Sequence, residues 1–335
     1  MFSKKVKVKH GKDLIKITDR LKNGEVLLMD GGTGSELQRR GVNVLKDATD
    51  KLEAWSATAN IDNPDVVIQV HQDYLRVGAD IIISNNFWTT PTSMERIGLR
   101  DQWSEYATAA ARNAVIARDN ENPFAYVAGG IAAPSLYVRV GINKPDVEIM
   151  GEESFTRDYL EHAKILADQG ADLILAEYVG YIADCVSAVK ACATVGLPVF
   201  LGIRHVDRQG NMQFGESIET LCSELKDLPV DAILIMCSNP EAITATLPKL
   251  VDAFDGPVGA YPNIGYNPTG PLINKPMLTN QLPSSGPDIL QIGTYTTSRL
   301  AEFAMEWKNM GAQIIGGCCA TGPEHIMAMK HVIKG

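Results

Sequence analysis

Eight short apolar segments alternate with longer stretches of helical spacing along this chain of 335 residues. Segments that are apolar on both faces are typical of strands in a parallel sheet whose faces are covered by helices. The eight segments are Val26–Met29, Ala79–Ile83, Ala125–Ala128, Ala171–Ala176, Pro198–Ile203, Asp231–Met236, Pro257–Ala260 and Ala312–Ile315. Between them, apolar residues recur every three or four positions, which predicts helices over Pro64–Val77, Glu153–Gln169 and Ser298–Met310.

Eight strand-then-helix units in series predict an α/β fold, a single-domain (β/α)8 TIM barrel. We expect this domain to cover residues 1–335, with residues 1–23 as an N-terminal extension or helix. A doubly wound parallel sheet is the alternative architecture for the same order of elements. The segment Asn263–Asp288 is rich in Pro, Gly, Asn and Ser, so we expect a long loop after the seventh strand.

The net charge of −9 argues against nucleic acid or an anionic membrane as a partner, because both require clustered Lys and Arg. No run of about 18 apolar residues is present, so we expect no membrane span. Six cysteines are too few for a disulfide scaffold, and no apolar stretch of a signal peptide follows the N-terminal lysines. We expect a cytoplasmic protein, and a homo-oligomer is compatible with its sequence.

Polar, aromatic and sulfur-bearing residues follow the predicted strands where the apolar pattern stops. Active sites of (β/α)8 barrels lie at the carboxyl ends of the strands, so these residues are candidates for a common site. They are Asp30, Gly31 and Gly32 after the first strand, Asn85 and Trp88 after the second, Glu177 and Tyr178 after the fourth, Cys237 after the sixth, and Cys318 and Cys319 after the eighth.

Three of the six cysteines are among these candidates. Only one strand separates the sixth strand from the eighth, so Cys237, Cys318 and Cys319 can converge on one metal ion. Three thiolates with one open position suit a catalytic zinc, whereas buried core cysteines or a vicinal redox pair are the alternatives. The remaining cysteines, Cys185, Cys192 and Cys222, and the histidines His71, His162 and His205 do not cluster, and we interpret them as structural.

A zinc site of this kind favours chemistry on a thiol. A coordinated thiol is deprotonated at neutral pH, which makes a nucleophile without a general base. Zinc hydrolases more often use His and carboxylate ligands, and the sequence has no H-E-x-x-H pattern. We therefore favour transfer of a carbon group to a bound thiol, with a hydrolase or a dithiol redox protein as alternatives.

Several segments together resemble the homocysteine S-methyltransferase family, in the same order along nearly the whole chain. The most specific is the double-cysteine ending, and the others support it. The matching segments are Asp30–Gly34, Ser84–Phe87, Cys237–Pro240, Ile314–Cys319 and Pro323–Ile326. One departure is Met236, where many relatives have Asn directly before the first of the three cysteines. The resemblance implies a (β/α)8 barrel, Zn²⁺ on Cys237, Cys318 and Cys319, and homocysteine as the methyl acceptor.

The resemblance also implies roles for the other candidates. Asp30, Gly31 and Gly32 are expected around the amino-acid end of homocysteine, and Asn85 is expected to be a substrate-binding residue. Glu177 is expected to pair with its ammonium group, as both a binding and a catalytic residue. The competing interpretations are a turn or helix-cap role for Asp30 and a surface salt bridge for Glu177.

The expected methyl donor is a small methylated onium compound, because aromatic faces recognise such cations. Trp55, Trp88 and Tyr178 are spaced as in the betaine-using branch of the family, so a betaine-like quaternary ammonium donor is favoured. That branch carries a long C-terminal arm that is absent here, which supports S-methylmethionine or another sulfonium as the alternative donor. Plain packing of these aromatic residues is the competing interpretation. Tyr261 and Asn263 are further candidates for the pocket lining.

The sequence leaves two further functions as alternatives, and the first is dinucleotide binding. Gly32 and Gly34 follow a strand as in a dinucleotide fold, but Leu37 stands where that fingerprint has its third glycine. A non-catalytic barrel that binds onium ligands is the second, and Met236 is the feature that supports it.

Overall fold

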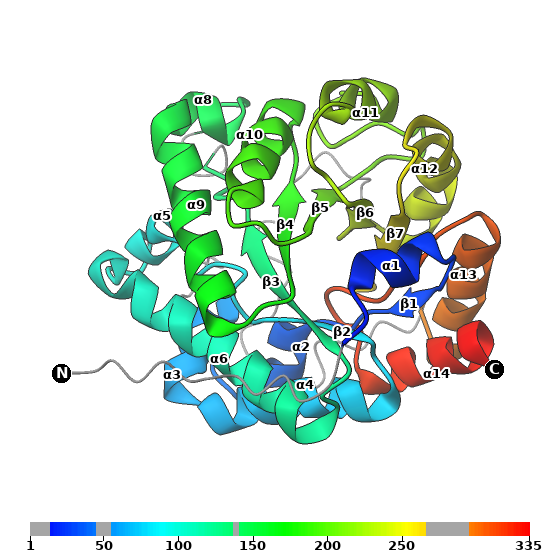
Figure 1. Cartoon of the computed structure of the whole chain (residues 1–335), viewed down its shortest axis with the longest axis horizontal. Coiled ribbons are helices and arrows are strands. Elements are labelled where there is room, and N and C mark those ends of the chain that lie inside the picture. The colour runs from blue at the N-terminus through cyan, green and yellow to red at the C-terminus, as the bar shows by residue number, and fades with distance from the viewer. Residues whose placement is uncertain (1–13, 45–54, 137–140, 266–294) are drawn as a thin grey trace.

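The computed structural model describes residues 14–44, 55–136, 141–265 and 295–335. Its eight strands are parallel and form one sheet in the order β1-β8-β7-β6-β5-β4-β3-β2 (Figure 1). The strands are β1 Leu27–Leu28, β2 Ile81–Ile83, β3 Tyr126–Ala132, β4 Leu173–Val179, β5 Val199–Arg204, β6 Ala232–Met236, β7 Val258–Tyr261 and β8 Ile314–Ile315. A parallel bridge between Met29 and Ile81 joins β1 to β2. The predicted single-domain (β/α)8 barrel is confirmed, and the doubly wound alternative is wrong because the two outermost strands meet.

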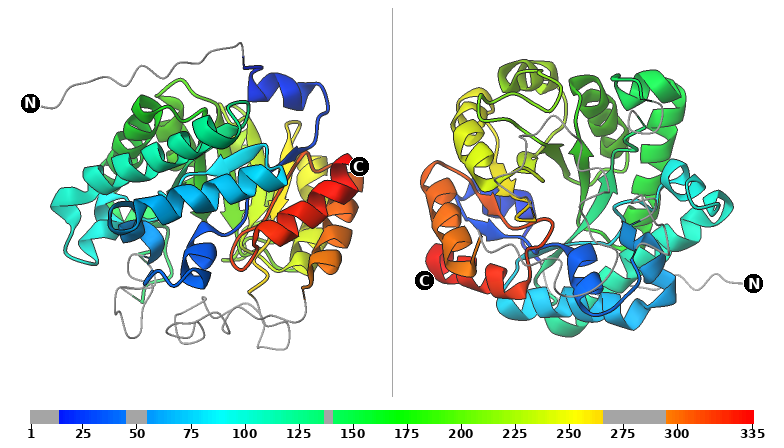
Figure 2. Two further views of the ribbon diagram at one scale, coloured as in Figure 1. Left: turned by 90° about the horizontal axis from the view of Figure 1, so that it is seen from below. Right: turned by 180° about the vertical axis from the view of Figure 1, so that it is seen from behind.

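Helices surround the barrel and bury the outward side chains of its strands (Figures 1 and 2). They are α1 Ile17–Lys22, α2 Thr33–Arg39, η1 Trp55–Thr58, α3 Ala59–Asp62, α4 Pro64–Val77, α5 Pro91–Glu95, η2 Arg100–Gln102, α6 Trp103–Glu121, α8 Asp146–Met150, α9 Glu152–Gln169, α10 Ile182–Ala193, α11 Ile218–Leu225, α12 Pro240–Ala253, α13 Thr297–Asn309 and α14 Pro323–Lys334. The three predicted helices correspond to α4, α9 and α13 to within one residue at each end.

Local signals in the sequence set the ends of these helices. Pro64 occupies the first turn of α4, where a missing N–H costs no hydrogen bond, and Gly78 ends the helix in the left-handed region at φ 105°. At α12, the side chain of Asn239 accepts a hydrogen bond of 2.7 Å from the N–H of Ala242. This cap fixes the direction in which the chain leaves β6.

The amino ends of the strands are closed by α1. Ile17 and Leu21 pack into the apolar cluster that fills the barrel, and the Tyr126 hydroxyl donates a 2.6 Å hydrogen bond to the carbonyl of Ile15. Figure 2 shows α1 at the end of the barrel opposite to α2, which follows the carboxyl end of β1. The opposite, carboxyl end of the barrel therefore holds the candidate site. Of the expected N-terminal extension, residues 1–13 lie outside the described part of the chain.

Two strands, β3 and β4, are longer than predicted. The expected strand Ala125–Ala128 continues to Ala132 because Gly129 and Gly130 remain paired with Ile174 and Leu175 of β4. Glycine weakens a strand, and in this barrel it marks close approach of neighbouring groups. A Cβ atom on Gly130 would lie 2.5 Å from Oε1 of Glu177.

Two further expectations concern the chain as a whole. Among the described residues, no helix has both the length and the apolar character needed to cross a bilayer. Most of the expected loop Asn263–Asp288 lies outside the described residues, which resume at Tyr295.

Candidate active site

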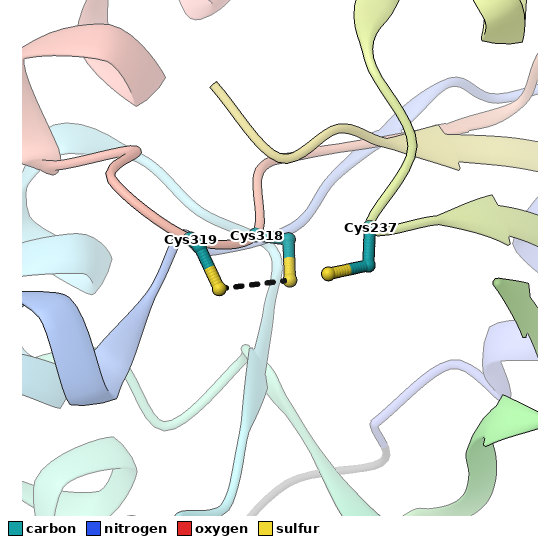
Figure 3. Close-up of side chains that lie close together, drawn as sticks. All are labelled: Cys237, Cys318 and Cys319. Atoms are coloured by element: carbon teal, nitrogen blue, oxygen red, sulfur yellow. Dashed lines mark hydrogen bonds between the residues drawn. The ribbon is translucent and has the colours of Figure 1, made fainter. Parts of the chain in front are cut away.

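Three thiols meet at the carboxyl end of the barrel. Cys237 directly follows β6, and Cys318 and Cys319 lie in the segment that follows β8 (Figure 3). Their sulfur atoms all lie within 4.8 Å of one another, and the sulfurs of Cys318 and Cys319 are 3.9 Å apart. Zinc–thiolate bonds of about 2.3 Å in tetrahedral geometry separate two sulfurs by about 3.8 Å. The three residues therefore fit a zinc ion, and they leave its fourth position to another ligand.

Backbone geometry brings these sulfurs together. Cys237 adopts a left-handed conformation at φ 48°, which turns its side chain into the barrel beside that of Met236. A Cβ atom on Gly317 would lie 2.1 Å from Cγ2 of Thr321, so only glycine fits before the double cysteine. The side-chain amide of Asn263 donates a hydrogen bond to the Cys237 sulfur at 3.5 Å.

A pocket opens above the three sulfurs. It is lined by Gly31, Gly32, Thr33, Gly34, Ser35, Trp55, Ser56, Ile83, Ser84, Asn85, Phe87, Trp88, Glu177, Tyr178, Met236, Cys237, Tyr261, Gly317, Cys318 and Cys319. All residues predicted for the site line this pocket except Asp30, which lies behind Gly31 and is fully buried. The further candidate Tyr261 lines it too, whereas Asn263 is not part of the lining and donates a hydrogen bond to the sulfur of Cys237.

An extra residue in β4 places Glu177 and Tyr178 in the pocket together. Ala176 pairs with Leu201 of β5, but the next pair is Val179 with Ile203, so β4 contains one residue more than β5. Tyr178 has a φ of 61°, and this bulge lets two consecutive side chains face the barrel mouth. The sequence predicted that both residues lie at the end of the strand, but it did not predict the bulge.

The carboxyl group of Glu177 is buried in the wall of the pocket. Burial raises its pKa to about 8, although a hydrogen bond with Tyr261 acts in the opposite direction. The carboxyl group is therefore mostly neutral near pH 7 in the metal-free protein. A surface salt bridge, the competing interpretation of Glu177, is wrong because the side chain is buried.

Asp30 is held beneath the pocket floor. Its Oδ2 atom accepts a 2.9 Å hydrogen bond from the N–H of Ile83, and Oδ1 has no hydrogen-bond partner among the described residues. Burial raises the pKa of Asp30 well above its usual range, and the charge of Glu177 raises it further. Ionisation of Glu177 therefore disfavours ionisation of Asp30.

The side chain of Asn85 holds the segment that carries Trp55. Its Oδ1 accepts a 2.6 Å hydrogen bond from the Ser56 hydroxyl, and its Nδ2 donates to the Ser56 carbonyl and to Oδ1 of Asn60, both at 3.0 Å. The indole of Trp55 packs against the backbone of Gly34 in α2. Asn85 thus lines the pocket with a side chain whose polar atoms form hydrogen bonds with Ser56 and Asn60.

Aromatic rings form one wall of the pocket. The ring centre of Phe87 lies 5.3 Å from that of Trp88 and 5.2 Å from that of Tyr178. Guanidinium groups flank this wall, with Arg96 over the Trp88 ring and Arg204 over the Tyr178 ring. Phe87 was not predicted as a site residue, although its place directly before Trp88 at the end of β2 is the signal that could have indicated it.

The cysteines and histidines that we interpreted as structural lie outside the pocket. Cys185 and Cys192 lie in α10 and Cys222 in α11, all buried as predicted. Burial lowers the pKa of His71 to about 4 and that of His162 to about 3, so both are neutral core residues at pH 7.

Comparison with known proteins connects this geometry to a family. The sequence profile of the homocysteine S-methyltransferases matches residues 27–333. The chain belongs to this family. The expected enzyme class, a homocysteine S-methyltransferase, is confirmed, which decides against the dinucleotide, hydrolase and dithiol-redox alternatives.

Individual relatives cover nearly the whole chain. The homocysteine S-methyltransferase of Escherichia coli K12 is 28% identical over 315 residues, which are 91% of this chain and 94% of the relative. The metallated form of the homocysteine methyltransferase MmuM from Escherichia coli has a TM-score of 0.72 and 26% identity, covering 93% of this chain and 98% of that chain. A methyltransferase from Methanosarcina mazei, at 12% identity and a TM-score of 0.53 over 92% of this chain and 94% of that chain, supports the fold alone.

Proposed function

We propose that this homocysteine S-methyltransferase moves a methyl group from a small onium donor, with a betaine-like quaternary ammonium favoured, and depends on zinc held by Cys237, Cys318 and Cys319. One observation carries the proposal: the three sulfurs lie within 4.8 Å of one another in the floor of a pocket walled by aromatic rings. Cys237, Cys318 and Cys319 would hold the zinc, which would supply a thiolate near neutral pH by lowering the pKa of a substrate thiol. The products are methionine and the demethylated donor.

The amino-acid end of homocysteine is proposed to lie against Gly31, Gly32 and Glu177. Both glycines line the pocket with backbone, because a Cβ atom on either would meet the carbonyl group of Thr321 or Cys318. Glu177, neutral in the empty site, would ionise when it pairs with the substrate ammonium. Asp30, one residue behind the pocket surface, accepts the hydrogen bond from the N–H of Ile83 at the end of β2, and Asn85 keeps Trp55 in place.

The donor is proposed to lie against the wall formed by Trp55, Phe87, Trp88 and Tyr178. Aromatic faces attract the positively charged head of an onium compound, and burial excludes water from the nucleophilic sulfur. The homocysteine sulfur attacks the donor methyl carbon in line, forming the new C–S bond. The bond from that carbon to the donor nitrogen or sulfur breaks, and its electron pair stays on the donor, which leaves as a neutral group.

A donor panel tests this proposal. Zinc-loaded protein is incubated with homocysteine and, separately, betaine, S-methylmethionine, dimethylsulfoniopropionate or S-adenosylmethionine, and methionine is quantified. We expect the highest rate with betaine or a close ammonium analogue. Methionine from the sulfonium compounds alone would assign the sulfonium alternative. Binding of an onium ligand without methionine from any donor would contradict the enzymatic proposal.

A further inference from the structure

The thioether sulfur of Met236 lies between two hydrogen-bond donors at the edge of the pocket. It accepts a 2.8 Å hydrogen bond from the backbone N–H of Tyr178 and a 3.1 Å hydrogen bond from the hydroxyl of Tyr261. The Met236 side chain is buried within the barrel and contributes to the pocket lining. A residue that an apolar pattern assigns to the core therefore acts here as a polar acceptor.

The first donor comes from the bulge in β4. The bulge takes the Glu177–Tyr178 peptide out of the regular ladder with β5, because the pairing passes from Ala176 directly to Val179. The carbonyl of Glu177 still accepts a 3.0 Å hydrogen bond from the N–H of Ala133, so the peptide is fixed on its other side. The bulge turns the N–H of Tyr178 inward, and the Met236 sulfur accepts its hydrogen bond. Loss of the acceptor would leave this buried N–H without a partner, which destabilises the bulge.

The second donor connects Met236 to the carboxyl group of Glu177. The Tyr261 hydroxyl also forms a hydrogen bond with Glu177. Because its single proton is donated to the sulfur, its oxygen accepts from the neutral carboxyl group and joins the two. All three groups converge over the backbone of Gly202. A Cβ atom there would lie 2.3 Å from the Tyr261 oxygen, 3.1 Å from the Met236 sulfur and 3.3 Å from Cβ of Glu177. The three side chains therefore pack together in the space that the missing side chain of Gly202 leaves.

We propose that Met236 is a positioning residue for the methyl-transfer site. Its sulfur, by accepting both hydrogen bonds, holds the Glu177–Tyr178 peptide and the Tyr261 hydroxyl where the amino-acid end of homocysteine binds. This inference rests on the proposed function of Glu177. It attributes the role of Met236 to the hydrogen bonds that its sulfur accepts and not to the volume of its side chain. Met236 is the residue that departs from the family pattern, and this gives it a physical role.

Two substitutions distinguish the loss of the sulfur acceptor from a change in side-chain volume. Met236→Leu conserves the volume and removes the acceptor, whereas Met236→Asn is smaller but places Oδ1 at the same number of bonds from the backbone as the sulfur. With zinc-loaded protein, we expect Met236→Leu to raise the Kd for homocysteine about tenfold, equivalent to about 1.4 kcal/mol, and Met236→Asn to stay within about threefold. Isothermal titration calorimetry measures both. The reverse order of effects, which a packing role predicts, would overturn the proposal.

Tyr261→Phe provides a second test that does not use the Asn variant. It removes one of the two donors, so Met236→Leu should weaken homocysteine binding less in the Tyr261→Phe background than in the wild type. Equal losses in the two backgrounds would contradict a role through Tyr261.

Hydrogen exchange of the Tyr178 amide tests the sulfur without any substrate. We expect this amide to exchange at least about tenfold faster in Met236→Leu than in the wild type or in Met236→Asn. Unchanged exchange in Met236→Leu would overturn the assignment of the sulfur as acceptor. Failure of the wild type to bind homocysteine would instead contradict the proposed function, and the exchange measurement would still decide the role of Met236.

Discussion

The guanidinium of Arg204 lies over the ring of Tyr178, with its Cζ atom 4.3 Å from the ring centre. Arg204 is 2% exposed and donates a 2.7 Å hydrogen bond to the Ser135 hydroxyl, so its charge is buried beside the pocket wall. A desolvated guanidinium gains about 2 kcal/mol from such an aromatic face. Tyr178 thus has a structural partner on one side while its side chain lines the pocket.

The first prediction concerns this double role. Tyr178→Leu removes the aromatic face from a buried charge, so we expect a loss of about 1–2 kcal/mol in the free energy of unfolding. The same change should raise the KM for the onium donor. Tyr178→Phe keeps the ring and should show smaller losses in both quantities. Chemical denaturation and donor kinetics measure the two effects, and equal behaviour of the Leu and Phe variants would show that the ring face does not matter.

The second prediction concerns the metal. Cys318→Ser removes one of three sulfur ligands, so we expect the protein to lose its zinc during dialysis against a chelator that leaves one zinc per wild-type chain. Cys222→Ser is the matched control, because Cys222 lies in α11 outside the sulfur cluster and should leave the zinc content unchanged. Elemental analysis measures the zinc-to-protein ratio. A Cys318→Ser variant that keeps its full zinc content would exclude the three-cysteine site.

The barrel and the three metal-ligand candidates could be predicted from sequence because each depends on a local pattern. Apolar segments indicated all eight strands, and the rule that barrel sites lie at carboxyl strand ends brought Cys237 to the Cys318–Cys319 pair. The limits of β3 were predicted less well. Gly129 and Gly130 look like the end of a strand in a local pattern, yet they are paired with β4 and make room for Leu166 and Glu177.

Features that depend on contacts between distant segments were not predicted. Tyr178, His205 and Cys237 follow one another around the barrel mouth at the ends of β4, β5 and β6, and all three have positive φ values. Left-handed conformations are uncommon for these residue types, so no sequence rule identifies them. The sequence identified Met236 only as a departure from the family pattern, whereas the structure shows that its sulfur accepts two hydrogen bonds.

The third prediction concerns the pH dependence of stability. The pKa of Glu177 is about 8 in the folded protein, against an ordinary value of 4.5, so folding takes up a proton between these values. Glu177 therefore favours the folded state most below about pH 4.5, and this contribution is lost as the pH rises through about 8. Relative to Glu177→Gln, the wild type should lose a few kcal/mol in the free energy of unfolding across that range.

Urea denaturation of metal-free wild type and Glu177→Gln, from about pH 5 to about pH 8.5, measures this difference. Thiols that do not interact with Glu177 contribute equally to both proteins and cancel in the comparison, whereas the charge of Cys319 raises the pKa of Glu177 and adds to the difference. A difference that does not change with pH would mean that the Glu177 carboxyl group ionises normally in the folded protein.

The last prediction concerns the contact between α2 and the indole of Trp55. A Cβ atom on Gly34 would lie 2.0 Å from Nε1 of Trp55, so Gly34→Ala must displace the indole from its place in the pocket wall. Alanine is otherwise about 1 kcal/mol more favourable than glycine inside a helix, so a harmful effect would come from this contact. We expect Gly34→Ala to raise the KM for the onium donor about tenfold while the Kd for homocysteine changes little.

Trp55→Leu provides the control for this contact, because the shorter side chain no longer reaches Gly34. In the Trp55→Leu background, we expect Gly34→Ala to have little further effect on the donor KM, since the two changes act on the same contact. Steady-state kinetics of the four proteins with the donor that the panel identifies measure this coupling. If Gly34→Ala raises the donor KM equally in both backgrounds, the effect arises in α2 itself, and Trp55 is not what the glycine accommodates.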